Sequence, residues 1–347
     1  MAQEPLSEQA VASLRLHEMA HSLGVTAALV AAAKLGIADA IAEEPVHADD
    51  LAKRVQAHPE ALRQLMRALV TRGVFEEVSD HVYGHTPLSV ALRADTPGSR
   101  RPWVLLAGAA FSWQVWSKLD DAVRTGASVF PDLYGKDMFA HLSEDEPELS
   151  ALFDRAAATS TAAIAEALAA ALHLGSATTV ADIGGGQGKL VRALLERHPD
   201  LRAVLFDTPR VLIDVDPALC GNGALAGRCS IVAGDVWQEV PVRADVYVIK
   251  GVLHMWNDDQ AAAALSSIRR SAPPGARIMV IEQLVGASSA PGITTIIDLL
   301  MLATQGGKER TAREFRALFE RAGLEFAGTT PTGPMNHLIE AVVPAHD

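Results

Sequence analysis

Apolar residues recur at helical spacing through the first part of the chain, and this pattern gives way to short apolar runs in the second part. Residues 17–42, HEMAHSLGVTAALVAAAKLGIADAIA, follow the helical pattern and are rich in alanine, which lets helices pack closely. Two further helices are predicted at 48–55 and 59–72, followed by strand-like runs at 73–78 and 81–86. This order of elements predicts a winged helix.

The segment between residues 103 and 174 has a less regular pattern. Aromatic residues gather in WVLLAGAAFSWQVWSKL and FPDLYGKDMFAHL, although they make up only 5% of the chain, and a helix is predicted over 148–174. Aromatic residues at helical spacing usually form core, but their concentration here also suggests a pocket for a flat apolar ligand. The candidates for contact with such a ligand are Trp103, Trp113, Met138, Phe139, Phe153, Met255, Met301 and Met335.

Short apolar runs alternate with helical patterns after residue 175. The alternation is typical of a parallel sheet that is covered on both faces, as in α/β folds. Helices are expected after the first, fourth and fifth strands. The strands are predicted at 178–183, 202–207, 229–235, 244–250 and 276–283. The last segment, LEFAGTTPTGPMNHLIEAVV, predicts two more strands joined by a Pro/Gly turn, which would add an antiparallel edge.

Composition and charge narrow the class of protein. The chain has 347 residues, 49% of them hydrophobic, which is enough for two domains with sizeable cores. Its net charge of -12 disfavours nucleic acid as a partner, because basic side chains must neutralise phosphates. We expect no signal peptide, no membrane span and a cytoplasmic location, because MAQEPLSEQA has no basic flank or apolar run. The two cysteines, Cys220 and Cys229, lack the spacing of a zinc site or a disulfide framework.

The predicted winged helix could read DNA or serve as a scaffold. Arg63, Arg67 and Arg72 lie along its second helix, as a DNA reader would need. The predicted wing, however, carries Glu76, Glu77 and Asp80, which would repel phosphates. We therefore favour a dimerisation scaffold for this region, since the fold serves several functions.

A glycine-rich stretch, VADIGGGQGKL, follows the first predicted strand of the second half and precedes a helix. Asp182, Gly184 and Gly186 lie at the carboxyl end of that strand, where glycines let a ligand approach the backbone. Lys189 stands where a dinucleotide fingerprint requires a small residue, which disfavours a nicotinamide dehydrogenase. The spacing suits S-adenosylmethionine, which has no pyrophosphate. A tight turn without a ligand is the alternative.

Polar residues at the next two strand ends strengthen the interpretation of a nucleoside site. Asp207 closes the second predicted strand, where a carboxylate can accept from both ribose hydroxyls. Asp235 closes the third, placed to accept from an adenine amino group while Val236 and Trp237 pack on the ring. Each aspartate alone could equally be a helix cap or a turn residue.

The chain resembles the S-adenosylmethionine-dependent O-methyltransferases of the plant caffeate/flavonoid type and their bacterial relatives that modify polyketide, phenazine and quinone natural products. The motifs that carry the resemblance are ALVAAAKLGIADAI, VADIGGGQGKL, FDTPRVL, GDVW, VIKGVLHMWNDD and GGKERTAREFRALFERAGL. The resemblance implies a homodimer with a helical, winged-helix dimerisation domain at 1–105. It implies a doubly wound, Rossmann-like methyltransferase domain at 106–347, with connecting helices at 106–174. It also implies contacts to the methyl donor from Gly184, Gly186, Asp207, Asp235, Val236 and Lys250.

His254 lies just beyond the fourth predicted strand, on the rim where such a sheet presents reactive groups. A phenol with a pKa of ~10 needs a base at neutral pH, and an imidazole with a pKa of ~6.5 is suited to take the proton. We therefore expect His254 to be the general base rather than a surface or capping histidine. The resemblance places Glu282 and Glu309 beside it, where a carboxylate would fix the tautomer and stabilise the imidazolium. No metal is expected.

One position departs from the family pattern. Many members have an aspartate directly after the histidine, whereas this chain has Met255, which favours an apolar acceptor face. Asn257 and Gln260 are expected to cap the following helix. The predicted activity is methyl transfer from S-adenosylmethionine, which leaves S-adenosylhomocysteine, to a hydroxyl of an aromatic small molecule of secondary metabolism. The alternatives are a nitrogen or carbon acceptor, and a non-catalytic regulator that binds the cofactor and uses the winged helix.

Overall fold

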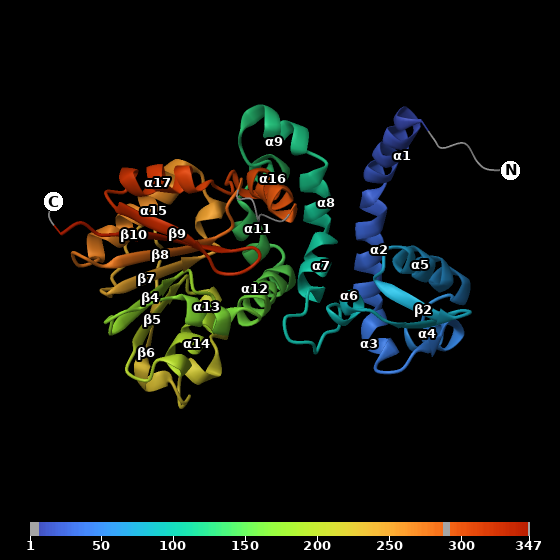
Figure 1. The fold of residues 1–347 in the computed structure, drawn as a ribbon, viewed down its shortest axis with the longest axis horizontal. Helices are drawn as coiled ribbons and strands as arrows, with labels where there is room; N and C mark the ends of the chain where they lie inside the picture. The colour runs from blue at the N-terminus through green and yellow to red at the C-terminus, as the bar shows by residue number, and fades with distance from the viewer. Residues whose placement is uncertain (1–6, 287–291, 346–347) are drawn as a thin grey trace. The chain divides into compact units, whose positions relative to one another are not determined.

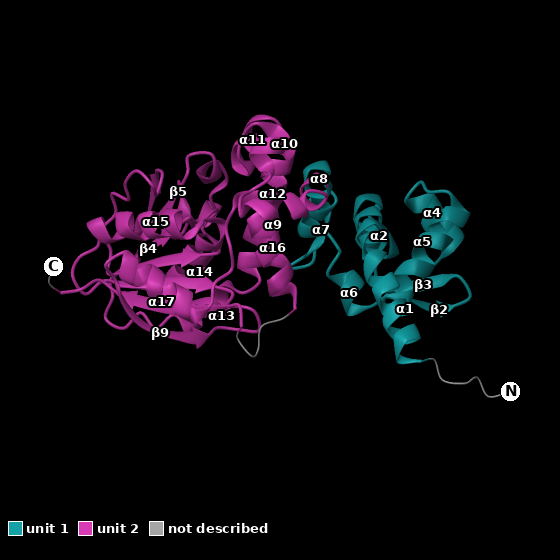
Figure 2. Ribbon diagram, turned by 90° about the horizontal axis from the view of Figure 1, so that it is seen from above, with its two compact units in different colours: residues 1–113 teal, residues 114–347 magenta. Residues whose placement is uncertain are grey.

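The computed structural model describes residues 7–286 and 292–345 (Figure 1). It divides the chain into two units, residues 1–113 and 114–347, which are coloured teal and magenta in Figure 2. The domain boundary predicted after residue 105 falls inside α7 (Arg101–Ala107). That boundary stays a prediction, because a domain and a compact unit are defined differently.

Unit 1 begins with helices that the alanine-rich segment forms. They are α1 (Glu8–Ala20), α2 (Ser22–Leu35) and α3 (Ile37–Ile41). Gly36 ends α2 because its φ of 66° is a left-handed conformation that glycine adopts without strain. The helical pattern predicted over 17–42 is therefore divided among three helices.

The predicted winged-helix order is present in unit 1. Helices α4 (Ala48–Arg54) and α5 (Pro59–Thr71) lie between the first and second strands of a small antiparallel sheet, whose strand order is β1-β3-β2. Its strands are β1 (Val46–His47), β2 (Phe75–Ser79) and β3 (Val82–His85). The helices α6 (Pro87–Val90), α7 and α8 (Ala110–Trp116) follow, and α8 contains the boundary between the units.

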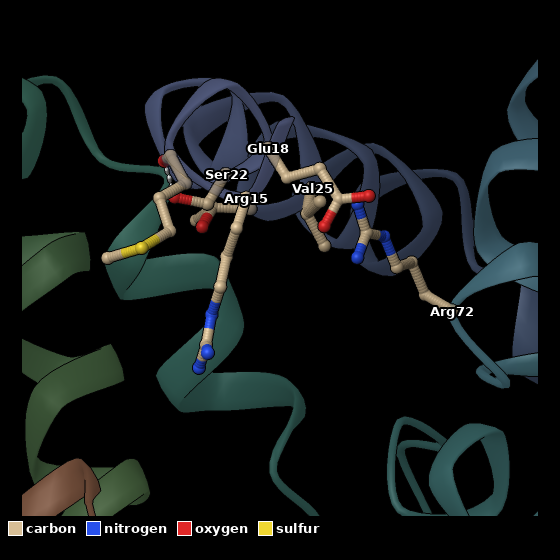
Figure 3. Close-up of a pocket in the computed structure, with 7 residues that line it drawn as sticks. Arg15, Glu18, Ser22, Val25 and Arg72 are labelled. Atoms are coloured by element: carbon tan, nitrogen blue, oxygen red, sulfur yellow. Dashed lines mark hydrogen bonds between the residues drawn. The ribbon is translucent and has the colours of Figure 1, made fainter. Parts of the chain in front are cut away.

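Unit 1 also has a pocket with a volume of about 410 Å³ (Figure 3). Its walls come from α1, α2 and the end of α5, and none of the predicted site residues lies in them. They are Arg15, Glu18, Met19, Ser22, Val25, Thr26 and Arg72.

Unit 2 begins with a series of helices that connect to the sheet. They are α9 (Leu119–Thr125), α10 (Phe130–Tyr134), α11 (Met138–Glu144), α12 (Pro147–Ala162) and α13 (Ala165–Ala171). The prediction of a single helix over 148–174 is wrong, because the helix is interrupted between the end of α12 at Ala162 and the start of α13 at Ala165. Thr161 donates its hydroxyl to the carbonyl of Ala157 at 3.0 Å, a side-chain bond that weakens the end of a helix.

A seven-stranded sheet forms the centre of unit 2, with the strand order β6-β5-β4-β7-β8-β10-β9. The first five strands in this order pair in parallel, and β10 pairs antiparallel with both β8 and β9, as the sequence predicted. The strands are β4 (Thr179–Ile183), β5 (Arg202–Asp207), β6 (Cys229–Ala233), β7 (Val246–Lys250), β8 (Arg277–Glu282), β9 (Glu325–Pro331) and β10 (His337–Val342).

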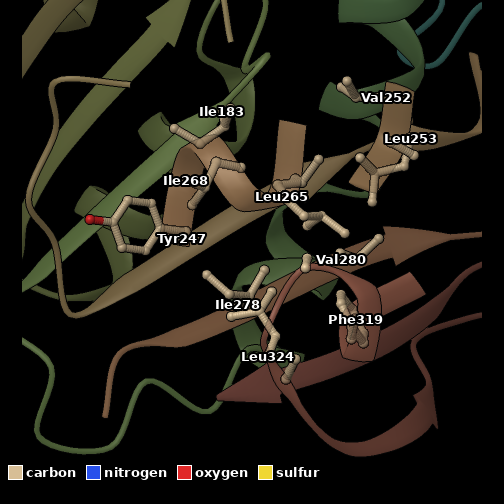
Figure 4. Packing of buried hydrophobic residues seen from close by; sticks show 14 of the residues in the cluster. Ile183, Tyr247, Val252, Leu253, Leu265, Ile268, Ile278, Val280, Phe319 and Leu324 are labelled. Carbon is tan, nitrogen blue, oxygen red and sulfur yellow. The ribbon is translucent and has the colours of Figure 1, made fainter. Parts of the chain in front are cut away.

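Helices cover both faces of this sheet because the buried strands are apolar on both sides. In β7, Tyr247 and Ile249 pack into a core with α15 and α17, which Figure 4 shows from close by, whereas Val246 and Val248 pack into a core with α13 and α14. The longer helices of this part are α14 (Lys189–Arg197), α15 (Asp258–Ser271), α16 (Ile293–Gln305) and α17 (Ala312–Arg321). The doubly wound α/β prediction is confirmed. Among residues 7–286 and 292–345, no helix is long and apolar enough to cross a bilayer.

Candidate active site

The parallel strands β4, β5, β6, β7 and β8 bring their carboxyl ends to one edge of the sheet. Asp207 is the last residue of β5, Lys250 of β7 and Glu282 of β8. Asp235 was predicted to close its strand, but β6 ends at Ala233, so this aspartate lies in the loop that follows. The predicted cofactor and catalytic residues therefore follow successive strands at one edge.

The glycine stretch forms the loop between β4 and α14. Gly184, Gly186 and Gly188 have φ values of 70°, 61° and 82°, which side chains rarely adopt. Gly185 is needed for a different reason, because a methyl group there would lie 2.7 Å from the carboxyl carbon of Asp182. A methyl group on Gly186 would meet nothing within 4 Å, so this part of the loop presents bare backbone with open space beside it.

Asp207 is bound to the glycine loop. One carboxylate oxygen accepts from the N–H of Gly186 at 2.8 Å and the other from the N–H of Thr208 at 2.7 Å. Burial raises the pKa of Asp207, and these two hydrogen bonds oppose the rise. Because a carboxylate has about four acceptor positions, Asp207 keeps acceptor capacity for the hydroxyls of a ribose.

Asp235 and Trp237 form the next part of the edge. The carboxylate of Asp235 accepts from the N–H of Trp237 at 2.9 Å, which closes a turn. Trp237 is 48% exposed, and the centroid of its ring lies 4.9 Å from that of Trp256. Val236 packs against the core on the α15 side of the sheet. An exposed indole beside a carboxylate has the groups to recognise a purine, one to stack on the ring and one to accept from its amino group.

Asp182 in β4 and Lys250 in β7 are buried ionisable residues on neighbouring strands of this edge. Asp182 is 2% exposed, and burial raises its pKa to about 7, although the charge of Lys250 acts against this rise. Burial lowers the pKa of Lys250, while Glu282 and Asp182 favour its charged form. The Lys250 ammonium donates to the hydroxyl of Thr161 at 3.1 Å. Thr161 was not identified from the sequence, since one threonine on a helix gives no signal.

Lys189 explains why this glycine loop does not suit a pyrophosphate. Its ammonium lies 2.8 Å from a carboxylate oxygen of Asp216, which is 3% exposed and also pairs with Arg192. The positive charge at the start of α14 is therefore already balanced by a buried acid. The residues present fit S-adenosylmethionine, which needs bare backbone, a ribose acceptor and an adenine contact but no phosphate site.

His254, Glu282 and Glu309 come together from three separate segments. His254 lies in a short 3-10 turn, η4 (Leu253–Met255), directly after β7. Its Nδ1 lies 2.7 Å from Oε1 of Glu309 and 3.5 Å from Oε2 of Glu282. The side chain of His254 is 20% exposed, whereas that of Glu309 is fully buried. The structure thus brings together the histidine and both of the acids that the sequence predicted.

Glu282 has a second contact with η4. Its Oε1 accepts from the N–H groups of Val252 at 3.0 Å, Leu253 at 2.9 Å and His254 at 3.3 Å. Glu282 thus binds the backbone of the turn as well as facing the imidazole. Glu309 is itself held in place, because its N–H donates to Asp298 at 2.8 Å. Asp298 was not identified from the sequence.

The two acids control the protonation of the imidazole. Burial would lower the pKa of His254, but the charge of Glu282 and the hydrogen bond and charge of Glu309 raise it to about 9, while Lys250 opposes them. Burial raises the pKa of Glu309, and the contact with His254 opposes that rise. Nδ1 is fixed as the nitrogen that faces the acids, so Nε2 is the nitrogen that can exchange a proton with a bound molecule.

The predicted acceptor-contact residues are distributed over both units. Trp103 and Trp113 lie in α7 and α8 of unit 1, where the Trp113 indole donates to the carbonyl of Gly108 at 3.2 Å. The others lie in unit 2, where Phe139 and Phe153 meet edge to face with their centroids 5.6 Å apart. Met138 is buried in α11, Met301 lies in α16, Met335 lies between β9 and β10, and Met255 lies in η4 beside His254.

The predicted cap of α15 is confirmed. Asn257 accepts from the N–H of Gln260 at 3.0 Å, and Gln260 accepts from the N–H of Asn257 at 3.2 Å. Together they form a capping box at the start of the helix that follows η4.

Comparison with known proteins gives matches over nearly all of the chain. Residues 116–325 match an O-methyltransferase domain, and residues 17–95 match an O-methyltransferase dimerisation domain. The phenazine O-methyltransferase PhzM of Lysobacter antibioticus is 34% identical over 94% of this chain and 95% of its own length. The mitomycin biosynthesis 6-O-methyltransferase of Streptomyces lavendulae is 36% identical over 88% of this chain and 87% of its own.

A solved structure has the same fold with small molecules bound. It is the O-methyltransferase NcsB1 from neocarzinostatin biosynthesis, in complex with S-adenosylmethionine and 2-hydroxy-5-methyl naphthoic acid. Its TM-score is 0.78 at 31% identity, and the alignment covers 92% of this chain and 96% of that chain.

Proposed function

The chain belongs to the S-adenosylmethionine-dependent O-methyltransferases, and we propose that it methylates a hydroxyl of an aromatic natural product with His254 as the general base. The observation that carries this proposal is the contact of His254 Nδ1 with Glu309 at 2.7 Å, at the edge that also holds the glycine loop. A base whose distal nitrogen is fixed by a carboxylate presents its other nitrogen in one orientation.

His254 takes the hydroxyl proton at Nε2 as the acceptor oxygen becomes a nucleophile. Glu309 keeps the Nδ1 proton in place and, with Glu282, stabilises the imidazolium that forms. When bound, S-adenosylmethionine supplies a methyl group on a sulfonium, which leaves as a neutral thioether. The protein must also align the acceptor oxygen with the methyl group. This alignment accelerates the transfer through proximity and orientation.

The residues proposed to hold the methyl donor are those of the glycine loop and the adjoining strand ends. Gly184 and Gly186 present backbone, and Asp182 and Lys250 are buried ionisable residues on the adjoining strands β4 and β7. Asp207 serves the ribose. Asp235, Val236 and Trp237 serve the adenine.

The acceptor is proposed to be a flat, largely apolar ring system of phenol, polyketide or quinone type. Met255 directly follows His254 in the chain, and Phe139 and Phe153 give an aromatic pair in the same unit. Trp103, Trp113, Met138, Met301 and Met335 remain proposed contacts. Relatives named for phenazine and mitomycin substrates support this acceptor class and a place in antibiotic biosynthesis.

The protonation of His254 limits the rate that this mechanism allows at neutral pH. With a pKa of about 9, roughly one imidazole in a hundred is neutral at pH 7. A further positive charge near the ring would lower that pKa, as Lys250 already does. The pH dependence of the rate of methyl transfer to the acceptor is therefore a direct test of His254 as the base.

The test of the activity is a screen of phenols, naphthols and hydroxyquinones with S-adenosylmethionine, followed by mass spectrometry for the gain of one methylene. The expected result is methylation on oxygen of at least one acceptor, lost without the methyl donor and inhibited by S-adenosylhomocysteine. Binding of S-adenosylhomocysteine with no acceptor turned over would support the non-catalytic regulator instead. Methylation on nitrogen or carbon would contradict the hydroxyl acceptor.

We also propose that two copies of the chain associate through unit 1. The match of residues 17–95 to a dimerisation domain supports this, as do the alanine-rich helix α2 and the apolar side chains that α1 exposes, including Leu14, Leu16 and Met19. The expected result in sedimentation equilibrium is a dimer. A fully active monomer at assay concentration would contradict the proposal.

A further inference from the structure

Arg310 lies next to Glu309 in the chain but contacts different groups. Its guanidinium is fully buried and makes three hydrogen bonds. Nη1 donates to the carbonyl of Leu253 at 2.8 Å and Nη2 to the carbonyl of Trp256 at 2.7 Å, on either side of His254. Nε donates to the carboxylate of Asp258 at 2.9 Å.

These bonds complete a set that encloses η4. Glu282 binds three N–H groups of this turn, and Arg310 binds the carbonyls at its start and just after its end. The Glu282 carboxylate therefore binds the N–H groups of the turn that carries His254, and the Arg310 guanidinium binds its carbonyl groups. A buried guanidinium is costly unless its donors are satisfied, and here the backbone of η4 satisfies two of its three donating nitrogens.

Gly307 gives an independent indication that this segment is shaped to fit η4. A methyl group on Gly307 would overlap the carbonyl oxygen of His254 and lie 2.5 Å from the carbonyl carbon of Met255. Its φ is outside the left-handed region, so the requirement for glycine comes from space and not from conformation. The backbone of this segment is also held, because the N–H of Gly307 donates to the carbonyl of Met301 at 3.2 Å and the N–H of Val285 donates to the carbonyl of Arg310 at 3.1 Å.

We propose that Arg310 and Gly307 are positioning residues for His254, which set the place of the imidazole by fixing the backbone of η4. The proposal rests on the proposed function, in which His254 is the base. A base must lie within hydrogen-bond reach of the proton it takes, and a displacement of about 1 Å can cost ~10²-fold in rate. A guanidinium fits this task better than an ammonium, because its planar fork reaches both carbonyls and Asp258 at once.

Lys308 provides a matched control for Arg310. Its ammonium pairs with the same Asp258 at 3.1 Å and with Glu314 at 3.0 Å, but it is one third exposed and, in the part of the chain that the structure describes, it does not bond to η4. Replacing Lys308 removes a cation from Asp258 and leaves the carbonyls of Leu253 and Trp256 bound. For Gly307 the control is Gly227, where a methyl group would meet nothing within 4 Å.

The test compares Arg310→Met, Arg310→Lys and Gly307→Ala with Lys308→Met and Gly227→Ala. The expected result is a fall in kcat of ~10²-fold for Arg310→Met, a smaller fall for Arg310→Lys and Gly307→Ala, and activity near wild type for both controls. Affinity for S-adenosylhomocysteine should stay close to wild type in every variant. If Arg310→Met does not fold, Arg310→Lys and Gly307→Ala carry the test.

A second readout separates positioning from a merely structural role. NMR titration of labelled histidine, with His254 assigned from the His254→Ala spectrum, should show its pKa falling from about 9 in Arg310→Lys and Gly307→Ala, because the imidazole moves away from Glu309. An unchanged titration with kcat reduced only in proportion to the folded fraction would overturn the proposal. If His254→Ala keeps full activity, the base assignment fails instead, and the titration still decides whether Arg310 and Gly307 position the ring.

Discussion

The edge of the sheet has two halves, one with Asp207 and Asp235 and the other with His254, Glu282 and Glu309. The carboxylates of the two halves have different kinds of partner. In the half proposed to bind the methyl donor, Asp207 and Asp235 accept mainly from backbone N–H groups and no lysine or arginine contacts them among the described residues. In the catalytic half, His254, Glu282 and Glu309 contact one another. The first half therefore keeps anionic acceptors for a ligand, whereas the second fixes the position of a proton.

The two halves should therefore respond differently to mutation. Loss of a carboxylate from the first half should remove ligand contacts and leave the base unaffected. Loss of a member of the second half should change the rate and its pH dependence while the cofactor still binds.

His254→Ala should lower kcat by ~10²–10⁴-fold and leave affinity for S-adenosylhomocysteine nearly intact, because removal of a positioned general base affects the transition state. The deficit should shrink as pH approaches the phenol's own pKa of ~10, where more acceptor is already ionised. The measurement is a pH–rate profile of both proteins on two acceptors of different acidity.

The less acidic acceptor gives the clearest decision on His254. An acceptor acidified by its own carbonyl group should depend less on the base, since alignment then supplies most of the acceleration. A variant within about threefold of wild type at neutral pH on the weaker acid lies well outside what loss of a general base allows. That result would remove His254 from the mechanism.

Asp207→Ala should weaken binding of S-adenosylhomocysteine by ~10- to 10²-fold for each ribose hydrogen bond lost, since bonds to a charged group contribute about 1.5–3 kcal/mol. Acceptor affinity should change far less. Calorimetry measures the effect, and Asp200→Ala is the matched control, because Asp200 is an exposed residue just before β5. An affinity equal to wild type would exclude Asp207 from the site.

The separation also explains what the sequence predicted and what it did not. The glycine loop is a continuous motif after one strand, and Asp207 and Asp235 follow the ends of the next two strands, so the strand pattern alone placed them at one edge. The pairing of His254 with Glu282 and Glu309 spans 28 and 55 residues of sequence, and only the family resemblance indicated it.

Residues that act on the backbone left no signal in the sequence. Arg310 lies inside a motif that was recognised, but a charged residue on a loop normally faces solvent. Its burial depends on carbonyls more than fifty residues away in the chain. The break between α12 and α13 was also missed, because the alanine-rich sequence on both sides of it favours a continuous helix.

Glu309→Gln should shift the pH profile towards acid. The Glu309 carboxylate helps to raise the pKa of His254 to about 9, and a neutral amide that still accepts the Nδ1 proton would let that pKa fall. More imidazole is then neutral at pH 7, which offsets part of the lost transition-state stabilisation. We expect kcat to fall by roughly tenfold at pH 9 and by less at pH 7.

The control for this variant is Glu320→Gln, an exposed position on α17 in the same part of the chain. It should leave the profile unchanged. If Glu309→Gln also leaves the acid limb where it is in wild type, Glu309 does not set the protonation of the base, and Glu282 alone would have to account for the raised pKa.

Removal of metal ions should have the smallest effect, and the reason lies in the catalytic half. Ligand atoms of His254, Glu282 and Glu309 lie within 4.8 Å of one another, which is close enough to hold an ion. A metal on Nδ1 would have to replace the proton that Glu309 accepts at 2.7 Å. We therefore expect turnover to survive EDTA unchanged, with no gain on addition of magnesium. Chelator-sensitive turnover restored by magnesium would mean that these three residues bind a metal and that His254 is not free to act as a base.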